Sequence, residues 1–112
     1  MKSEETIRVV WEYLVKEEET ENFISVYSSD GEWAQLFKKY PGYIKTELIR
    51  ETLNSQRFIT IDYWASLDAY LSMQQKNKAD YNVLDKKCQS YTTHENKIGI
   101  FQSLANNKRR NK

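Results

Sequence analysis

The sequence has one cysteine, one proline, three glycines and one histidine among its 112 residues. Cys88 alone cannot form an internal disulfide. Three glycines leave little room for a glycine-rich phosphate loop, and the residues show no metal-ligand spacing, so no metal is expected. No apolar run approaches 18 residues, and the first residues do not resemble a signal peptide. These absences predict a cytoplasmic protein that does not associate with a membrane.

Charge is nearly balanced overall but unevenly distributed along the chain. The formal net charge is +1, with nine acidic and three basic side chains in residues 1–32 and the reverse in residues 76–112. Much of the basic excess lies in the tail 104–112, which we expect to be polar and flexible beside a single domain at 1–103. A tail without a basic face on the folded body does not make a nucleic-acid interface, so no nucleic-acid partner is expected.

Aromatic residues are abundant, with three tryptophans, eight tyrosines and four phenylalanines. They supply enough apolar surface for the core of one globular domain. The segment from Thr6 to Lys16 alternates strictly between apolar and polar residues, which predicts a first strand. One side of that strand carries Ile7, Val9, Trp11, Tyr13 and Val15.

Two regions show the spacing of amphipathic helices. In the first, residues 20–40 predict a helix in two pieces, with Thr20 as its N-cap and Pro41-Gly42 at its end. In the second, Ser66 is the predicted N-cap of a helix that continues to about residue 91. The polar run 74–78 divides this second helix into two.

Three further strands are predicted at residues 43–50, 57–64 and 92–101. The resulting order βαββαβ indicates an α+β, ferredoxin-like fold with a four-stranded antiparallel sheet and helices on one face. The other face of the sheet includes Val10 and Leu14 and needs cover. A two-fold homodimer would provide that cover most simply.

Several segments together resemble the antibiotic biosynthesis monooxygenase (ABM) domain family. The likeness covers residues 6 to 101 and is one of pattern, since the Trp-x-Ser junction at the end of the third strand occurs in functionally diverse members. The segments concerned are Trp11–Lys16, the helix around Phe23, Gly31–Phe37, Gly42-Tyr43, Ile61–Ser66, and Glu95 with Ile98-Gly99.

The resemblance implies a dimeric α+β barrel with a pocket in each subunit between the sheet and its helices. Members include cofactor-free oxygenases of aromatic polyketides and haem-degrading enzymes. Trp64 matches the tryptophan that borders the pocket in the haem-degrading branch. That branch also uses an asparagine on the first strand, where Trp11 lies here, and a histidine on the second helix, which has none. Haem is therefore not expected, and His94, beyond that helix, is the only histidine left to ligate iron.

A cofactor-free oxygenase of phenols needs a base, a dry apolar pocket and hydrogen-bond donors. Asp62 is the first candidate base, since it shares a strand face with Thr60 and Trp64 and an apolar setting would raise its pKa. His94 is the second candidate base, and Trp64 completes the predicted catalytic set. The predicted binding residues for a small aromatic substrate are Trp11, Tyr13, Trp33, Phe37, Thr60 and Tyr81.

Structural roles compete with each of these assignments. Asp62 could cap the following helix or pair with Arg57 or Arg50, the tryptophans could only pack, and His94 could be exposed. Two function classes follow: cofactor-free oxidation of a planar aromatic molecule, or a non-catalytic or non-oxidative (isomerase- or cyclase-like) dimeric binding module. An open pocket with Asp62 of raised pKa near Trp64 favours the enzyme. A cavity filled by aromatic side chains favours the binding module.

Overall fold

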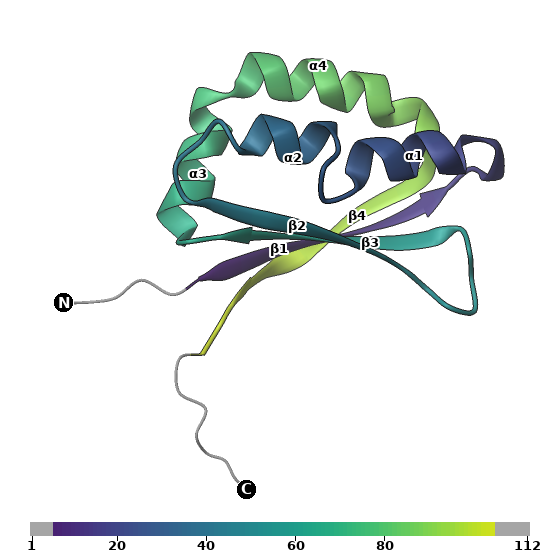
Figure 1. The fold of residues 1–112 in the computed structure, drawn as a ribbon, viewed down its shortest axis with the longest axis horizontal. Coiled ribbons are helices and arrows are strands. Elements are labelled where there is room, and N and C mark those ends of the chain that lie inside the picture. The colour runs from purple at the N-terminus through teal and green to yellow at the C-terminus, as the bar shows by residue number, and fades with distance from the viewer. Residues whose placement is uncertain (1–5, 105–112) are drawn as a thin grey trace, which may run out of the picture.

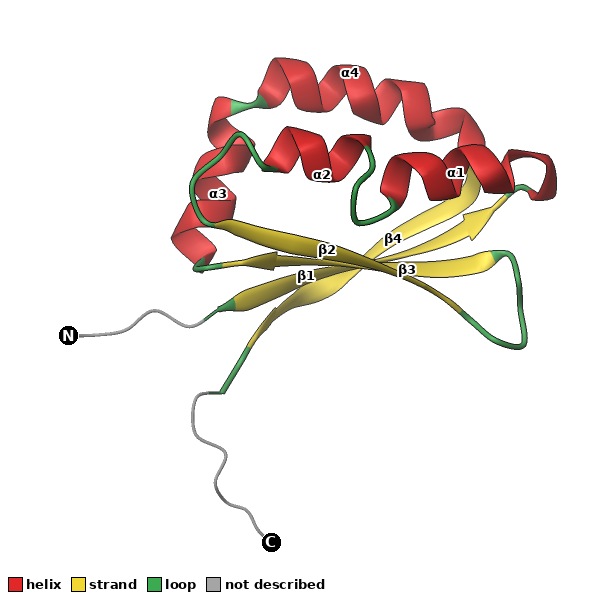
Figure 2. Cartoon of the chain, in the orientation of Figure 1, coloured by secondary structure: helices red, strands yellow, loops and turns green. Residues whose placement is uncertain are grey.

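A computed structural model describes residues 6–104 of the chain. The predicted basic tail therefore lies, except for Leu104, outside the described residues, and its flexibility stays a prediction. Figures 1 and 2 show the strands as one layer and the helices as another. The elements are β1 (Ile7–Val15), α1 (Thr20–Tyr27), α2 (Glu32–Phe37), β2 (Tyr43–Arg50), β3 (Arg57–Trp64), α3 (Leu67–Lys76), α4 (Lys78–Cys88) and β4 (Thr92–Gln102), with 3-10 turns at Glu17–Glu19 and Gln89–Tyr91.

The four strands form one sheet in the order β2-β3-β1-β4, and every neighbouring pair is antiparallel. The helices all lie on one face of this sheet (Figure 1). The predicted ferredoxin-like α+β fold is therefore confirmed. The predicted division of both helical regions is also confirmed, because α1 and α2 are separate and Asn77 lies between the end of α3 and the start of α4.

The two predicted helix caps have different outcomes. Ser66 caps α3 as predicted, since its Oγ accepts a hydrogen bond of 3.1 Å from the backbone N–H of Ala69. The prediction for Thr20 is wrong. The acidic run Glu17–Glu19 already turns as a 3-10 helix, so Thr20 is helical, and its hydroxyl donates to the Lys16 carbonyl at 3.2 Å.

The core lies between the sheet and the helices and is largely aromatic. Phe23 and Tyr27 stack at 4.1 Å between ring centroids, and Tyr13 of β1 meets both rings edge-on. At the other end of the sheet, Trp64 is 0% exposed. Aromatic pairs stabilise the fold beyond the burial of their apolar surface, so these contacts hold the helices in one position on the sheet. Trp64 contacts Phe37, Tyr43 and Tyr70 edge-on.

Gly42 makes the turn from α2 into β2. Its φ is +93°, the conformation that glycine adopts without strain, and its carbonyl accepts a 2.7 Å hydrogen bond from the N–H of Ala65. A Cβ at this position would lie 2.4 Å from the Cβ of Ala69. The turn therefore packs directly against the first turn of α3.

Replacing Gly42 by alanine is expected to lower the free energy of unfolding by about 2 kcal/mol or more, because the left-handed conformation and the clash with Ala69 both oppose a side chain. Urea denaturation followed by circular dichroism would measure the change. Gly99→Ala is the control, since Gly99 does not have a positive φ and its added Cβ would meet only the ring of Phe101 at 3.3 Å. Equal losses in the two variants would contradict the argument.

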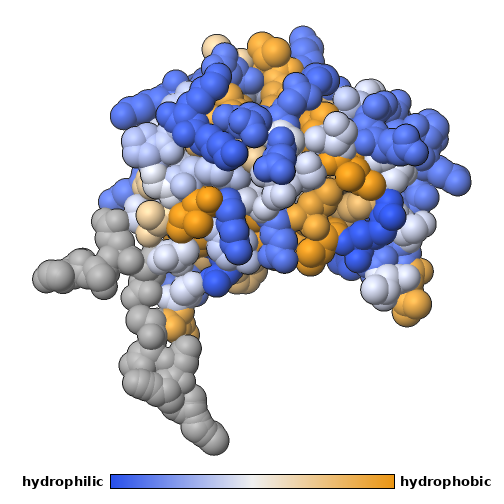
Figure 3. Space-filling view, in the orientation of Figure 1, coloured by the Kyte–Doolittle hydropathy of each residue, from blue (hydrophilic) through white to orange (hydrophobic). Residues whose placement is uncertain are grey.

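The face of the sheet away from the helices is open in this chain. It carries an ion-pair network in which Arg57 donates to Glu12 at 2.6 Å and to Glu51 at 3.2 Å. Half-buried apolar side chains surround this network, among them Val10, Leu14, Ile59 and Ile61. In the space-filling view, hydrophilic side chains cover most of the helical layer and hydrophobic atoms reach the surface in patches (Figure 3). Pairing of the open face with a second copy of the chain stays a prediction.

Candidate active site

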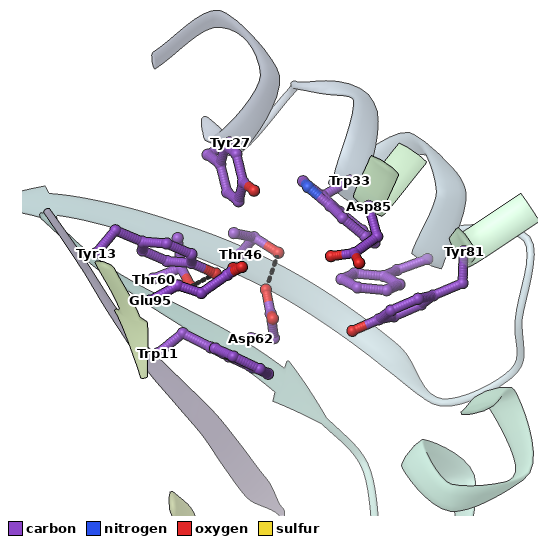
Figure 4. Close-up of a pocket in the computed structure, with 11 residues that line it drawn as sticks. Trp11, Tyr13, Tyr27, Trp33, Thr46, Thr60, Asp62, Tyr81, Asp85 and Glu95 are labelled. Carbon is purple, nitrogen blue, oxygen red and sulfur yellow. Dashed lines mark hydrogen bonds between the residues drawn. The ribbon is translucent and has the colours of Figure 1, made fainter. Parts of the chain in front are cut away.

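A pocket lies between the helix-facing side of the sheet and the helical layer (Figure 4). All four strands contribute to its wall, together with α1, α2 and α4. The lining residues are Trp11, Tyr13, Tyr27, Trp33, Phe37, Thr46, Thr60, Asp62, Tyr81, Asp85 and Glu95. Aromatic rings thus surround a small number of carboxyl and hydroxyl groups, which is the usual composition of a small-molecule site.

The pocket is partly filled by its own aromatic side chains. About 440 Å³ is free of atoms when the open mouth is included, but the centre of a water-sized sphere can occupy only about 40 Å³. A single water needs roughly 10–15 Å³ by the same measure, so the inner space holds a few waters. Binding of any aromatic ring would require the walls to move.

Asp62 lies on the wall formed by β3. One of its oxygens, Oδ1, accepts a 2.6 Å hydrogen bond from the hydroxyl of Thr46, its cross-strand neighbour on β2. Burial raises the pKa of Asp62 from 3.8 to about 6, and the bond from Thr46 opposes this rise in part. Oδ2 bonds to none of the described residues, and Asp62 keeps part of its surface open to the pocket. Asp62 is thus placed to exchange a proton with a ligand near neutral pH.

A second hydroxyl supports the bond to Asp62. The oxygens of Thr46 and Tyr43 lie 2.7 Å apart. Since Thr46 has a single hydroxyl proton and donates it to Asp62, Tyr43 must be the donor to Thr46. The relay holds the carboxylate of Asp62 in one orientation, with Oδ1 occupied.

The phenols of the pocket remain protonated at neutral pH. Burial raises the pKa of Tyr13 well above 10, and burial also raises the pKa of Tyr27 and Tyr81. The hydroxyl of Thr60 lies 3.5 Å from that of Tyr13. These tyrosines can donate hydrogen bonds to a ligand but cannot act as its base.

Two further carboxyl groups, Glu95 on β4 and Asp85 on α4, face the same space (Figure 4). Burial, and then the charge of Asp85, raise the pKa of Glu95. Neither residue belongs to the predicted site, and nor do Tyr27 and Thr46. The sequence contains a signal for two of these four residues. Asp85 follows Tyr81 by one helical turn, so the two side chains share a helix face. The short connection between β2 and β3 implies an antiparallel pair, in which Thr46 lies opposite Asp62.

The pocket brings together seven of the nine predicted site residues: Asp62, Trp11, Tyr13, Trp33, Phe37, Thr60 and Tyr81. The other two, Trp64 and His94, are not in its wall. Trp64 lies behind Phe37, with 5.6 Å between their ring centroids, and belongs to the core. Its indole N–H is buried and has no hydrogen-bond partner among the described residues.

His94 is exposed and lies on the open face of the sheet. It pairs with Leu14 in the ladder between β1 and β4, whereas Glu95 pairs with Tyr13 and faces the pocket. His94 therefore lies near Glu12, whose pKa is lowered mainly by the hydrogen bond from Arg57 and to a smaller extent by His94. The structure places His94, the second candidate base, on the face of the sheet opposite to Asp62 and the pocket.

The structural alternatives for Asp62 are wrong. Ser66 caps the following helix, and Arg57 pairs with Glu12 and Glu51. The guanidinium of Arg50 instead lies 4.7 Å from the centre of the Phe58 ring. No basic side chain of the described chain therefore pairs with Asp62.

Two other features of the described residues bear on the site. Between residues 6 and 104, no three His, Cys, Asp or Glu side chains lie close enough together to hold one metal ion. None of the helices there is both long and apolar enough to cross a membrane.

Comparison with known proteins assigns the chain to a family. Residues 6–79 match the model of the antibiotic biosynthesis monooxygenase family. The chain belongs to that family. The resemblance seen in the sequence is thereby confirmed. A search of curated protein sequences finds no match.

Several solved structures share the fold of this chain. One is SnoaB, a cofactor-independent oxygenase from Streptomyces nogalater, in a mutant form (TM-score 0.72, 19% identity, 94% of this chain and 99% of that one). Another is a proposed antibiotic biosynthesis monooxygenase from Bordetella bronchiseptica (TM-score 0.70, 18% identity, 90% and 99%). A third is a conserved protein from Methanosarcina mazei (TM-score 0.63, 18% identity, 89% and 94%). At these identities the likeness establishes the fold of the ABM domain.

Proposed function

We propose that this ABM protein oxidises a phenolic aromatic small molecule with molecular oxygen and without a cofactor. The observation that carries the proposal is Asp62, a half-buried carboxyl group of raised pKa that opens into an aromatic pocket. A base of this pKa can deprotonate a bound phenol near neutral pH. The cofactor-independent oxygenase SnoaB, which shares the fold, is consistent with this chemistry.

The reaction balances without an external reductant. Asp62 takes the hydroxyl proton, and the electron-rich phenolate gives electrons to O₂ and forms a C–O bond at a ring carbon that carries hydrogen, ortho or para to its oxygen. The peroxide anion takes the proton back from Asp62, and the hydroperoxide then loses the hydrogen of that carbon as a proton while its O–O bond breaks. One oxygen atom remains on the ring as a quinone carbonyl and the other leaves as water. The substrate supplies all four electrons.

The pocket also offers donors for the negative charge of the phenolate. Tyr13, Tyr27 and Tyr81 keep their hydroxyl protons, and the indole N–H of Trp33 has no partner among the described residues. Donors already fixed in a dry site stabilise developing charge without reorganisation. The ring of a planar substrate would stack against the aromatic walls.

Oxygen uptake by the purified protein with a panel of single-ring and fused-ring hydroxylated aromatics tests this proposal. Quinone formation is followed by absorbance and by mass spectrometry, under air and under nitrogen. Turnover under air that stops under nitrogen is expected, with one ¹⁸O atom from labelled oxygen in the product. Turnover that continues under nitrogen would overturn the oxidative chemistry.

The pH dependence of turnover should report the ionisation of Asp62. Since the base must be ionised, kcat/KM is expected to rise through an apparent pKa of about 6 and to level off above it. The bond from Thr46 lowers that pKa, so Thr46→Val should move the midpoint to higher pH, with a larger loss of rate at pH 6 than at pH 8. Thr93→Val, on the exposed part of β4, is the control. An unmoved midpoint in Thr46→Val would separate Asp62 from the observed titration.

The small inner volume of the pocket favours a second candidate function, a non-oxidative binding module or isomerase. About 40 Å³ is too little for any aromatic ring unless side chains move. A protein of this kind would bind a small aromatic ligand, and Asp62 would at most shuttle a proton. Saturable quenching of the tryptophans by a ligand, with no oxygen uptake, distinguishes this function from the first.

A further inference from the structure

We propose that the pocket selects a positively charged aromatic ligand: a single-ring phenol that carries an ammonium group, with the phenol at Asp62 and the ammonium between Glu95 and Asp85. This inference rests on the proposed function for the identity of the site and extends it to the class of substrate. It stands on the charges of the pocket, on its aromatic walls and on the depth of each group.

The charges of the lining residues all have one sign. Three carboxyl groups, Asp62, Asp85 and Glu95, face the pocket, and no lysine, arginine or histidine lines it. Lys97 comes near the wall but does not line the pocket, since its ammonium donates a 3.0 Å hydrogen bond to the hydroxyl of Tyr70 and lies 6.0 Å from the ring centre of Trp11. Among the described residues, Lys97 forms no ion pair with Asp62, Asp85 or Glu95. An anionic ligand would meet like charges, whereas a cation would relieve their mutual repulsion.

The aromatic walls favour the same kind of ligand. Trp33 and Tyr81 meet edge-on with 4.9 Å between their ring centroids, and Trp11 forms the opposite wall (Figure 4). The faces of such rings attract cations, and carboxylates combined with aromatic rings form the sites that recognise ammonium groups. The carboxylates are also too widely spaced for one metal ion, since no metal-binding group of three occurs in residues 6–104.

The indole N–H of Trp33 is a further donor that could bind an acceptor oxygen of a ligand. Trp33 is 8% exposed, and its indole N–H lacks a hydrogen-bond partner among the described residues. In Figure 4 this nitrogen lies beside the hydroxyl end of Tyr27, at the edge of the pocket. A buried donor without a partner costs free energy unless a bound molecule accepts from it. A phenol oxygen can supply that acceptor.

The depth of each carboxyl group sets the orientation of the ligand. Glu95 is exposed, whereas Asp85 on α4 and Asp62 on the sheet are both half-buried, and Thr46 binds the Oδ1 of Asp62 against the sheet. An ammonium group is costly to desolvate, so it is expected at the mouth between Glu95 and Asp85. The neutral phenol then occupies the inner end. Asp62 therefore does not pair with the cation and keeps its basicity. Because even one ring enters only when side chains move, a single-ring ligand requires the smallest rearrangement of the walls.

Three phenols of nearly equal size test the selection by charge: tyramine (cation), 4-(2-hydroxyethyl)phenol (neutral) and 3-(4-hydroxyphenyl)propanoate (anion). Dissociation constants are measured at pH 7.5 by tryptophan fluorescence, with calorimetry as a second readout. We expect tyramine to bind about tenfold more tightly than the neutral phenol, and the anion to bind most weakly. We also expect the preference to shrink in 0.5 M salt. Equal affinities, a preference for the anion, or no binding of any probe would overturn the inference.

Two variants test which residues give the pocket its preference for a cation. Glu95→Gln and Asp85→Asn should each weaken tyramine binding several-fold and leave the affinity for the neutral phenol within about twofold. Glu18→Gln removes the same charge from the exposed turn before α1 and is the matched control. An equal loss of affinity for both ligands in the Glu95 and Asp85 variants would mean that these carboxyl groups shape the pocket but do not select a ligand by its charge.

Binding and oxidation are measured separately, so the two proposals can fail independently. Selective binding of tyramine without any oxygen uptake would support the charge selection and reject the oxygenase. Oxygen uptake with neutral phenols that is as fast as with tyramine, together with equal affinities, would support the oxygenase and reject the charge selection.

Discussion

Asp62→Asn is expected to abolish oxygen-dependent turnover and, at the same time, to stabilise the protein at neutral pH. Loss of a positioned general base costs about 10²- to 10⁴-fold in rate. The amide keeps the shape of the side chain and can still accept the hydrogen bond from Thr46. The loss of rate would therefore report the missing proton transfer.

The gain in stability follows from the raised pKa of Asp62. Between pH 3.8 and about 6 the folded protein holds a proton that the unfolded chain releases, so ionisation of Asp62 destabilises the fold as pH rises through this window. The penalty is fully present above pH 6 and absent below pH 4. Asparagine does not ionise, so the free energy of unfolding of the variant should exceed that of the wild type by about 2 kcal/mol at pH 7.5 and should equal it at pH 4.

Urea denaturation of wild type and variant at the two pH values measures this difference. Asp68→Asn is the control, because Asp68 is an exposed acid in the first turn of α3 and its loss should cost a few tenths of a kcal/mol. A variant that is inactive and less stable at pH 7.5 would show that Asp62 holds the fold together. Full activity in Asp62→Asn would remove this residue from the mechanism.

Trp64→Ala is expected to cause the largest loss of stability of any single change considered. The side chain is fully buried between Phe37, Tyr43 and Tyr70, and removing it leaves a large cavity, at a cost of about 3–5 kcal/mol. Calorimetry should show a much lower midpoint of thermal unfolding. Turnover would fall with the folded fraction.

Trp64→Phe separates packing from catalysis at this position. Phenylalanine keeps part of the ring contact and removes an indole N–H that has no partner among the described residues, so the loss of stability should be smaller than the change in volume suggests. Because Trp64 is not in the wall of the pocket, kcat/KM of the folded variant should stay within about threefold of wild type. A hundredfold loss of kcat/KM with an intact fold would restore the catalytic role implied by the family resemblance.

The sequence was sufficient to predict the fold because each element has a strong local pattern. The alternation from Thr6 to Lys16 predicted β1 to within one residue at each end, and Ser66 marked the start of α3. On β3, the same alternation placed Phe58, Thr60 and Asp62 on one face. Most of the pocket followed, since side chains on this face meet the helices.

His94 was proposed for its intrinsic pKa alone, and its position on the far face of the sheet has a physical cause in β4. Val10 pairs with Gly99 and Trp11 pairs with Lys97, so Ile98 is an extra residue in the ladder, a β-bulge. Alternation counted back from Ile100, which pairs with Val9, would turn Asn96 and His94 toward the helices. The bulge reverses this order and turns Glu95 and Lys97 inward. Such a bulge depends on pairing between strands far apart in the sequence, so local alternation cannot detect it.

Because of the register set by the bulge at Ile98, the deletion of a single residue of β4 would change which side chains face the pocket. Loss of the codon for Asn96 alone, with Lys97 kept opposite Trp11, would bring His94 opposite Tyr13 and turn Glu95 to the far face. An acidic wall would become one with an imidazole, although no residue had been substituted. On this scaffold, the insertion or deletion of one strand residue is a route by which related proteins can exchange one ligand charge for another.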